Sequence, residues 1–168
     1  MRLNGASLAV AMCLVLLVTG SALADDHGLL KGKYRIFSSL NNVGSTTHLY
    51  FTGIITYDGK GHATMTDSGT VIDSISNSAT APSFEETGSF TYAVKHDGSF
   101  TQEGSFESNP KGSYTVTGVK WVGQISADGS VLIISGAIPP QLSIFTSGGV
   151  AYERIGGFTA TAVRIRHE

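Results

Sequence analysis

The sequence predicts an all-β protein, an antiparallel up-and-down meander closed into a barrel of about eight to ten strands. An alternating apolar and polar run reaches an Asp-Gly pair three times, and a second run follows at once. Asp-Gly is a turn dipeptide because glycine adopts positive φ without a Cβ clash, so each pair indicates a β-hairpin. No window after Ala24 has an apolar stripe with helical spacing. The three hairpins are Gly53–Tyr57 before Asp58-Gly59, Phe90–Lys95 before Asp97-Gly98, and Trp121–Ser126 before Asp128-Gly129.

The N-terminal segment has the pattern of a cleaved signal peptide. Arg2 supplies the positive charge, Leu8–Val18 is an uncharged apolar run, and Ser21-Ala22-Leu23-Ala24 supplies small residues for cleavage. A membrane-spanning helix needs about 20 apolar residues, roughly twice the length of this run. We therefore expect residues 1–24 to be removed, residues 25–168 to form one barrel domain, and the protein to be periplasmic or extracellular.

Composition excludes several classes of protein. The single cysteine, Cys13, lies inside the apolar run, so the mature domain has no thiol for a disulfide or a thiolate metal site. The chain has 11 Lys and Arg against 13 Asp and Glu, and a formal net charge of −2. A nucleic-acid-binding domain is usually basic, so nucleic acid is not an expected partner. The length suits one domain that buries most of its surface on folding.

The strands are expected in the following order. A leader or short cap at Asp25–Leu30 comes first, and Ser74–Pro82 is a surface loop of low complexity. The last strand divides at Gly156-Gly157 if it forms two strands. The predicted strands are Lys33–Ser39, Thr46–Tyr57, His62–Ile72, Phe84–Val94, Ser99–Glu107, Tyr114–Ile125, Val131–Ala137, Leu142–Thr146 and Ala151–Arg166.

Glycines inside the predicted strands favour closure of the sheet. Glycine within a strand marks a bend, a bulge or a close approach of two backbones, and such features curl a sheet into a barrel. Closure also removes exposed strand edges. The alternative is a two-sheet β-sandwich, which needs longer crossover connections. The glycines are Gly53, Gly88, Gly104, Gly118, Gly123 and Gly136.

The first hairpin resembles one found in small exported bacterial proteins of unknown function. The segment Gly53–Gly61 is similar to their G-x-x-x-[FY]-D-G-x-G hairpin, and Gly32-Lys33-Tyr34, Tyr92 with Asp97-Gly98, and Thr159–Arg164 fit the same pattern. The resemblance implies a calycin-like or allene-oxide-cyclase-like barrel. It implies no activity.

A weaker resemblance is to lipocalins. In that family a Gly-x-Trp sequence opens the first strand, and a late arginine packs across the Trp ring. Here Gly32-x-Tyr34 and Arg164 or Arg166 stand in the corresponding places, with tyrosine instead of tryptophan. A guanidinium group over an aromatic face contributes about 0.5–2 kcal/mol. The resemblance implies that Tyr34 and one of these arginines form a structural contact.

The polar residues indicate no catalytic centre. Neighbouring residues of a strand face opposite sides, so Glu85 and Glu86 cannot act on one substrate. Glu103 and Glu107 share a face, which is explained by a solvated barrel exterior. No Gly-x-Ser-x-Gly sequence is present. We therefore assign no catalytic residue and no cofactor.

No metal site is predicted either. The histidines lack the short His-x-His or His-x3-His spacings of metal ligands, and the first Asp-Gly-x-Gly turn lacks the further oxygen ligands of a calcium loop. The histidines beside turns are interpreted as solvated. The histidines that follow the signal peptide are His27, His48, His62, His96 and His167.

Aromatic residues occur on almost every predicted strand, and Phe90 and Tyr92 alternate onto one face. An eight-stranded barrel is just wide enough to be filled by side chains or to hold one small ligand, and both alternatives stay open. The continuous apolar run Val131-Leu132-Ile133-Ile134 suggests burial on both faces. The outer face would then be covered by Asp25–Leu30, by Ser74–Pro82, or by another subunit in a homo-oligomer.

These observations rank three functions for an exported soluble β-barrel. The first is binding of a small apolar ligand inside the barrel, with ligand-binding residues that the sequence does not identify. The second is an envelope interaction or structural protein that acts through its surface or an oligomer. The third is an enzyme of the isomerase or cyclase type, which rests on analogy of fold.

Overall fold

The computed structural model describes residues 26–42, 46–73, 83–137 and 142–166. The predicted signal peptide, the loop Ser74–Pro82 and His167 lie outside these residues. The described chain forms one sheet of ten antiparallel strands. The strands are β1 (Lys31–Asn42), β2 (Thr47–Asp58), β3 (His62–Asp73), β4 (Ser83–Val94), β5 (Ser99–Ser108), β6 (Tyr114–Ile125), β7 (Val131–Gly136), β8 (Ser143–Ser147), β9 (Val150–Arg154) and β10 (Gly156–Arg164).

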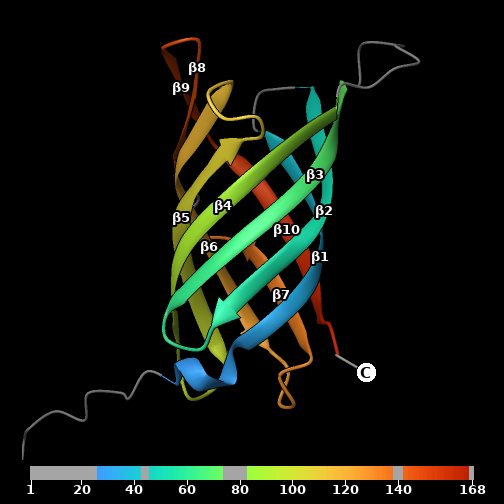
Figure 1. The fold of residues 1–168 in the computed structure, drawn as a ribbon, viewed down its shortest axis with the longest axis vertical. Helices are drawn as coiled ribbons and strands as arrows, with labels where there is room; N and C mark the ends of the chain where they lie inside the picture. Colours follow the sequence, from blue (N-terminus) through green and yellow to red (C-terminus); the bar gives the residue numbers. More distant parts are fainter. Residues whose placement is uncertain (1–25, 43–45, 74–82, 138–141, 167–168) are drawn as a thin grey trace, which may run out of the picture.

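Eight of these strands close into a barrel, which confirms the predicted fold class. β1 to β7 follow one another around the ring, β5 pairs with β6, and β10 closes it between β7 and β1. The remaining hairpin, β8–β9, lies outside the ring. It pairs with the first half of β6 and projects above the barrel in Figure 1. The last predicted strand is therefore two strands, β9 and β10, which meet beside Gly156 as expected.

The three Asp-Gly turns form as the sequence predicts. The glycines Gly59, Gly98 and Gly129 all have positive φ, of 76°, 78° and 67°. In each turn the aspartate carboxylate accepts a hydrogen bond from the backbone N–H two residues later, at 2.7 to 3.1 Å. These Asx-type bonds fix the turns and hence the register of the paired strands.

Period-two alternation separates the inside of the barrel from the outside. On β2 the predicted core face holds, since Phe51, Ile55 and Tyr57 are buried. Glycine permits close approach of neighbouring strands: a Cβ atom on Gly104 would lie 2.1 Å from the carbonyl oxygen of Ser89 on β4. The predicted role of strand glycines in closing the sheet agrees with this contact.

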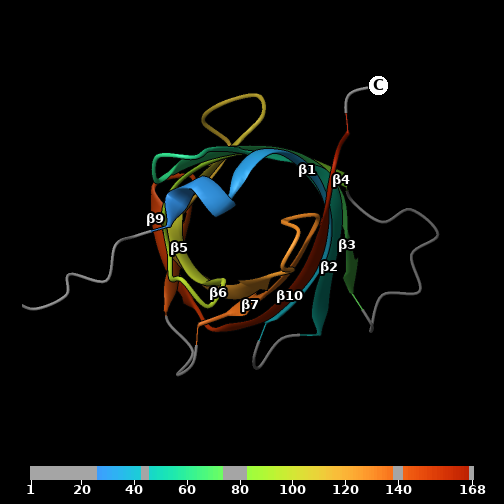
Figure 2. The same ribbon diagram turned by 90° about the horizontal axis from the view of Figure 1, so that it is seen from below.

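The lower end of the barrel is closed. A short 3-10 helix, η1 (His27–Leu29), lies across it, and the β6–β7 turn folds inward beside the helix (Figure 2). The expected cap at the N-terminus of the domain is therefore present. Tyr92 donates from its hydroxyl to the carbonyl oxygen of Leu30 at 2.8 Å, and Tyr34 donates to that of Gly129 at 2.8 Å. These buried bonds attach the cap and the turn to the barrel wall.

The expected burial of both faces of Val131–Ile134 is wrong for the single chain. Leu132 and Ile134 point into the core, whereas the side chain of Ile133 is 64% exposed. The N-terminal segment covers the lower end of the barrel and not this strand. Ile133 is thus an apolar residue on the outer face of β7, which is why the sequence of this strand does not alternate between apolar and polar residues.

Candidate functional site

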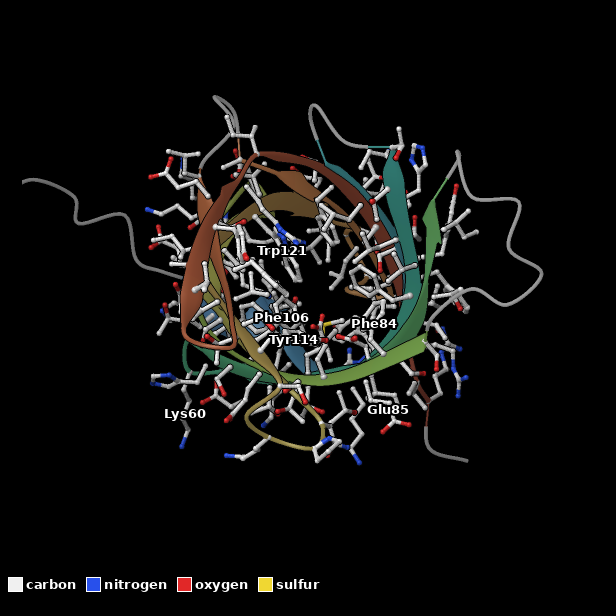
Figure 3. All side chains as sticks on the ribbon, turned by 90° about the horizontal axis from the view of Figure 1, so that it is seen from above. Lys60, Phe84, Glu85, Phe106, Tyr114 and Trp121 are labelled. Carbon is white, nitrogen blue, oxygen red and sulfur yellow. The ribbon has the colours of Figure 1, made fainter. Side chains whose placement is uncertain are left out.

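A cavity of about 310 Å³ opens at the upper end of the barrel, opposite η1. Its walls come from most of the barrel strands and from the β8–β9 hairpin. Figure 3 looks into this end, where Phe84, Phe106, Tyr114 and Trp121 lie inside the ring of strands and Lys60 and Glu85 lie outside. The two alternatives for the interior are therefore both partly met: the lower half is packed and the upper half is hollow.

Aromatic rings form the deep wall of the cavity. The ring of Trp121 is stacked on that of Phe158, with centroids 4.3 Å apart and an interplanar angle of 6°. The Trp121 ring also contacts Phe106 at 5.7 Å, and Phe51 stacks on Phe158 at 6.0 Å. Rings from several strands thus interlock across the barrel and separate the cavity from the closed end. Flat apolar surfaces of this kind suit a flat apolar ligand.

The cavity also contains a carboxyl group, Glu86, which lines it from β4. The hydroxyl of Tyr114 on β6 donates to Glu86 Oε2 at 3.0 Å. Burial raises the pKa of Glu86 to about 7, although this hydrogen bond acts in the opposite direction. Glu86 therefore exchanges a proton near neutral pH.

A second carboxyl group lies beside Glu86. Asp67 on β3 is the register partner of Glu86, and its side chain lies on the same inner face of the sheet. Asp67 is 7% exposed, and neither of its carboxyl oxygens has a hydrogen-bond partner within the described ranges. Burial and the neighbouring Glu86 raise the pKa of Asp67 to about 8.

Two residues that border the cavity are basic, and one of them, Lys120, points to the outside of the barrel. The guanidinium carbon of Arg154 on β9 lies 4.0 Å from the centre of the Phe145 ring, a cation–π contact. Lys120 on β6 forms an ion pair with Glu103 at 3.1 Å. Among the described residues, neither Lys120 nor Arg154 has a side-chain nitrogen within 4.0 Å, the limit for an ion pair, of a carboxyl oxygen of Asp67 or Glu86. The acidic pair therefore has no protein cation to neutralise it.

The structure places the residues that the sequence singled out as follows. Glu85 lies on the outside and Glu86 on the inside, which confirms that the two cannot share a substrate. Glu103 and Glu107 pair with Lys120 and Lys111, as expected for a solvated exterior. Within the four described ranges, no group of three or more His, Cys, Asp or Glu residues could hold a metal ion.

The predicted contact of Tyr34 with a late arginine is only partly as expected. Arg164 is the register partner of Tyr34, and its positive charge opposes the rise that burial causes in the pKa of Tyr34. The Tyr34 hydroxyl, however, binds Gly129, and the cation–π contact that the structure records is that of Arg154 with Phe145. Tyr34 and Arg164 are thus partners on the two strands β1 and β10 that close the barrel, but their side chains are not stacked in the expected cation–π contact.

Sequence reasoning does not single out Asp67 or the Glu86–Tyr114 pair. The inward direction of Glu86 can be predicted from the sequence, because it lies an even number of positions from Phe90 and Tyr92, which face inward. The pairing of Asp67 with Glu86 depends on the register of β3 against β4. The sequence does not predict this register, because no tight turn links the end of β3 at Asp73 to the start of β4 at Ser83.

Comparison with known proteins adds little to this description. No family model matches the chain, and no curated protein matches it. A solved structure of EF1p2_mFAP2b bound to DFHBI is similar over 86% of this chain and 100% of its own, at 12% identity and a TM-score of 0.48. Likeness at this level carries no conclusion about family or function, so the β-barrel assignment rests on the strand pairing. Within the described ranges, no helix has the length and apolar character needed to cross a membrane.

Proposed function

We propose that this protein binds a small, mainly apolar molecule in the upper cavity of its barrel. The observation that carries the proposal is a cavity of about 310 Å³ whose walls are aromatic and aliphatic and which contains few polar groups. Ligand sites have this composition, because apolar walls supply affinity and a few polar groups fix the orientation. The lower end is covered by η1 and the β6–β7 turn, and the cavity lies toward the upper end of the described barrel.

A plugged cavity tests the proposal. Gly136 lines the cavity, and a Cβ atom there would meet nothing closer than 3.7 Å, so Gly136→Leu places a side chain in the pocket without a backbone clash. Gly157 on β10 is exposed, and Gly157→Leu is the matched control.

The measurement is titration with N-phenyl-1-naphthylamine, an uncharged dye that fluoresces in apolar surroundings. We expect saturable binding to the wild-type protein and to Gly157→Leu, and affinity at least tenfold weaker for Gly136→Leu. Absence of saturable binding to the wild-type protein, or equal affinity for Gly136→Leu, would overturn the proposal.

A second candidate function is action through the outer surface, in a homo-oligomer. Phe37, Ile133 and Val163 are exposed on the neighbouring strands β1, β7 and β10, where Thr161 separates Phe37 from Ile133 in the register. Apolar residues gathered on an outer face are typical of interaction sites. Sedimentation velocity tests this: we expect an oligomer that Ile133→Ser dissociates, and a monomer at all concentrations rejects the oligomer.

A third candidate is proton-transfer catalysis of the isomerase type, favoured by the position of Glu86 in an apolar cavity and its pKa of about 7. A general base works best when its pKa is close to the operating pH. The test is exchange of the α-hydrogens of 2-tetralone for deuterium, followed by NMR. We expect catalysis that Glu86→Gln removes and Glu85→Gln keeps; exchange at the buffer rate rejects this candidate.

Export of the mature domain remains part of the proposed role. Its support is the pattern of residues 1–24, with Arg2, the apolar run and the small residues before Asp25. Expression of the full chain in a bacterium, followed by N-terminal sequencing of the periplasmic and secreted fractions, tests it. We expect a mature protein that begins at Asp25, and recovery of only uncleaved protein in the cytoplasm rejects it.

A further inference from the structure

The cavity has a charge pattern that an apolar ligand alone does not explain. Glu86 and Asp67 stand opposite each other on β4 and β3, and both side chains face the barrel interior. Asp67 is more than nine-tenths buried, and its two carboxyl oxygens have no partner within the described ranges. A buried carboxyl group without a hydrogen-bond partner is costly, so such groups are usually paired in a protein.

The pair lacks a cation. The two basic residues that border the cavity have other partners. Lys120 forms an ion pair with Glu103, and Arg154 lies over the ring of Phe145. Tyr114 donates its one hydroxyl proton to Glu86 and cannot neutralise charge. The charged groups at the cavity are therefore the carboxyl group of Glu86, with Asp67 beside it, and the guanidinium group of Arg154.

We propose that the ligand of this cavity is an amine with an aromatic or alicyclic body, which places its ammonium group at Glu86 and Asp67. This inference rests on the proposed ligand-binding function and names the chemical class of the ligand. The ammonium group supplies the missing positive charge and donates up to three hydrogen bonds, one of which can reach each carboxyl group. The apolar body then packs on the Trp121 and Phe158 rings.

The guanidinium group of Arg154 favours the same position. It repels an ammonium group, so the favourable place for the positive charge is at the carboxyl groups and away from Arg154. An anionic ligand would place its charge beside two carboxyl groups if it entered charge-first. The cavity should therefore discriminate among ligands of the same shape and different charge.

Three probes of nearly equal shape test the inference: 1-naphthylmethylamine, 1-naphthalenemethanol and 1-naphthoic acid. Isothermal titration calorimetry at pH 8 gives their affinities for the wild-type protein. We expect the amine to bind at least about tenfold more tightly than the alcohol, since a charged hydrogen bond exceeds a neutral one by about 1.4 kcal/mol. The acid should bind most weakly.

Two variants locate the effect. Glu86→Gln should remove the preference for the amine, so that the amine and the alcohol bind with similar affinity. Glu85→Gln makes the same change on the outside of the same strand and should leave the preference intact. Asp67→Asn should weaken amine binding as well, and this variant serves as the second measurement if Glu86→Gln does not fold.

The pH dependence gives a further readout. The ionisable groups that line or adjoin the site are Glu86, Asp67, Tyr114, Arg154 and Lys120. The pKa values of Glu86 and Asp67, about 7 and about 8, lie within or at the end of the range from pH 6 to pH 8. Amine affinity should rise across this range while alcohol affinity stays constant.

The outcomes separate the inference from the function beneath it. Equal affinities for the amine and the alcohol, or an amine preference that survives Glu86→Gln, would overturn the amine assignment and leave the ligand-binding function standing. If none of the three probes binds the wild-type protein, the ligand-binding proposal itself fails.

Discussion

Gly53 on β2 leaves the space that the Asp67 side chain occupies on β3. A Cβ atom on residue 53 would lie 2.5 Å from the Asp67 Cβ atom and 2.3 Å from the Thr66 carbonyl oxygen, both closer than real Cβ atoms approach. The two residues are register partners, so the buried carboxyl group depends on a glycine in the neighbouring strand. The absence of a side chain at Gly53 therefore permits both the buried carboxyl group of Asp67 and the close approach of β2 and β3.

Gly53→Ala is expected to destabilise the fold by about 1–3 kcal/mol, because the clash is with backbone atoms and with a Cβ atom that cannot rotate away. Gly136→Ala is the control. Its Cβ atom would meet nothing closer than 3.7 Å, and loss of unfolded-state entropy should stabilise the protein by about 0.4–1 kcal/mol. Urea denaturation of both variants gives the two values. Equal stability of Gly53→Ala and the wild-type protein would contradict the close approach.

The buried bond between Tyr57 and Gln102 supports a second prediction. The Tyr57 hydroxyl donates to Gln102 Oε1 at 2.8 Å, and Gln102 is 1% exposed. Tyr57→Phe leaves the amide oxygen without its donor and should cost about 1–3 kcal/mol. Combining it with Gln102→Leu removes both partners, so the double variant should lose less stability than the sum of the single variants. A double-mutant cycle by urea denaturation measures the coupling, and strict additivity would show that the bond is absent.

Asp67 and Glu86 should make stability fall as the pH rises. Folding raises their pKa values from ordinary values of 3.8 and 4.5 to about 8 and about 7. Between about pH 4 and pH 8 the folded protein therefore holds more protons than the unfolded chain, and the free energy of unfolding decreases across this range. The decrease should be on the order of 3 kcal/mol or more for the coupled pair. Urea denaturation at a series of pH values should show a flatter profile for Glu86→Gln and an unchanged one for Glu85→Gln.

The stacked pair of Trp121 and Phe158 predicts a spectroscopic change. Phe158→Ala removes a buried ring that lies 4.3 Å from the indole and should destabilise the protein by about 3–5 kcal/mol. Trp121 is the single tryptophan of the sequence, so its emission should shift to the red as its surroundings become wetter. Phe37→Ala on the outer face, where the ring is 55% exposed, should cost under about 1 kcal/mol and leave the emission unchanged. Similar losses for the two variants would place Phe158 outside the core.

The barrel was accessible from the sequence because its signals are local. Asp58-Gly59 and its two counterparts fix hairpins, and the alternation of Phe90 and Tyr92 shows which side faces inward. The site was less accessible because its parts come together only through register and closure. Asp67 meets Glu86 across a connection whose length does not set the pairing, and Tyr114 reaches Glu86 from β6, two strands away along the ring. The β8–β9 hairpin, which completes the rim, looks like one more wall strand in sequence and pairs with β6 instead.

One end of the barrel is covered by η1 and the inward-folded turn (Figure 2), and the cavity lies toward the other end. A molecule that enters through this end also departs through it. A substitution that it meets only in passage, such as one at the exposed Tyr152 on β9, would therefore slow arrival and departure by the same factor. The residence time can thus change at the rim while the equilibrium constant stays fixed by the aromatic and acidic wall beneath it.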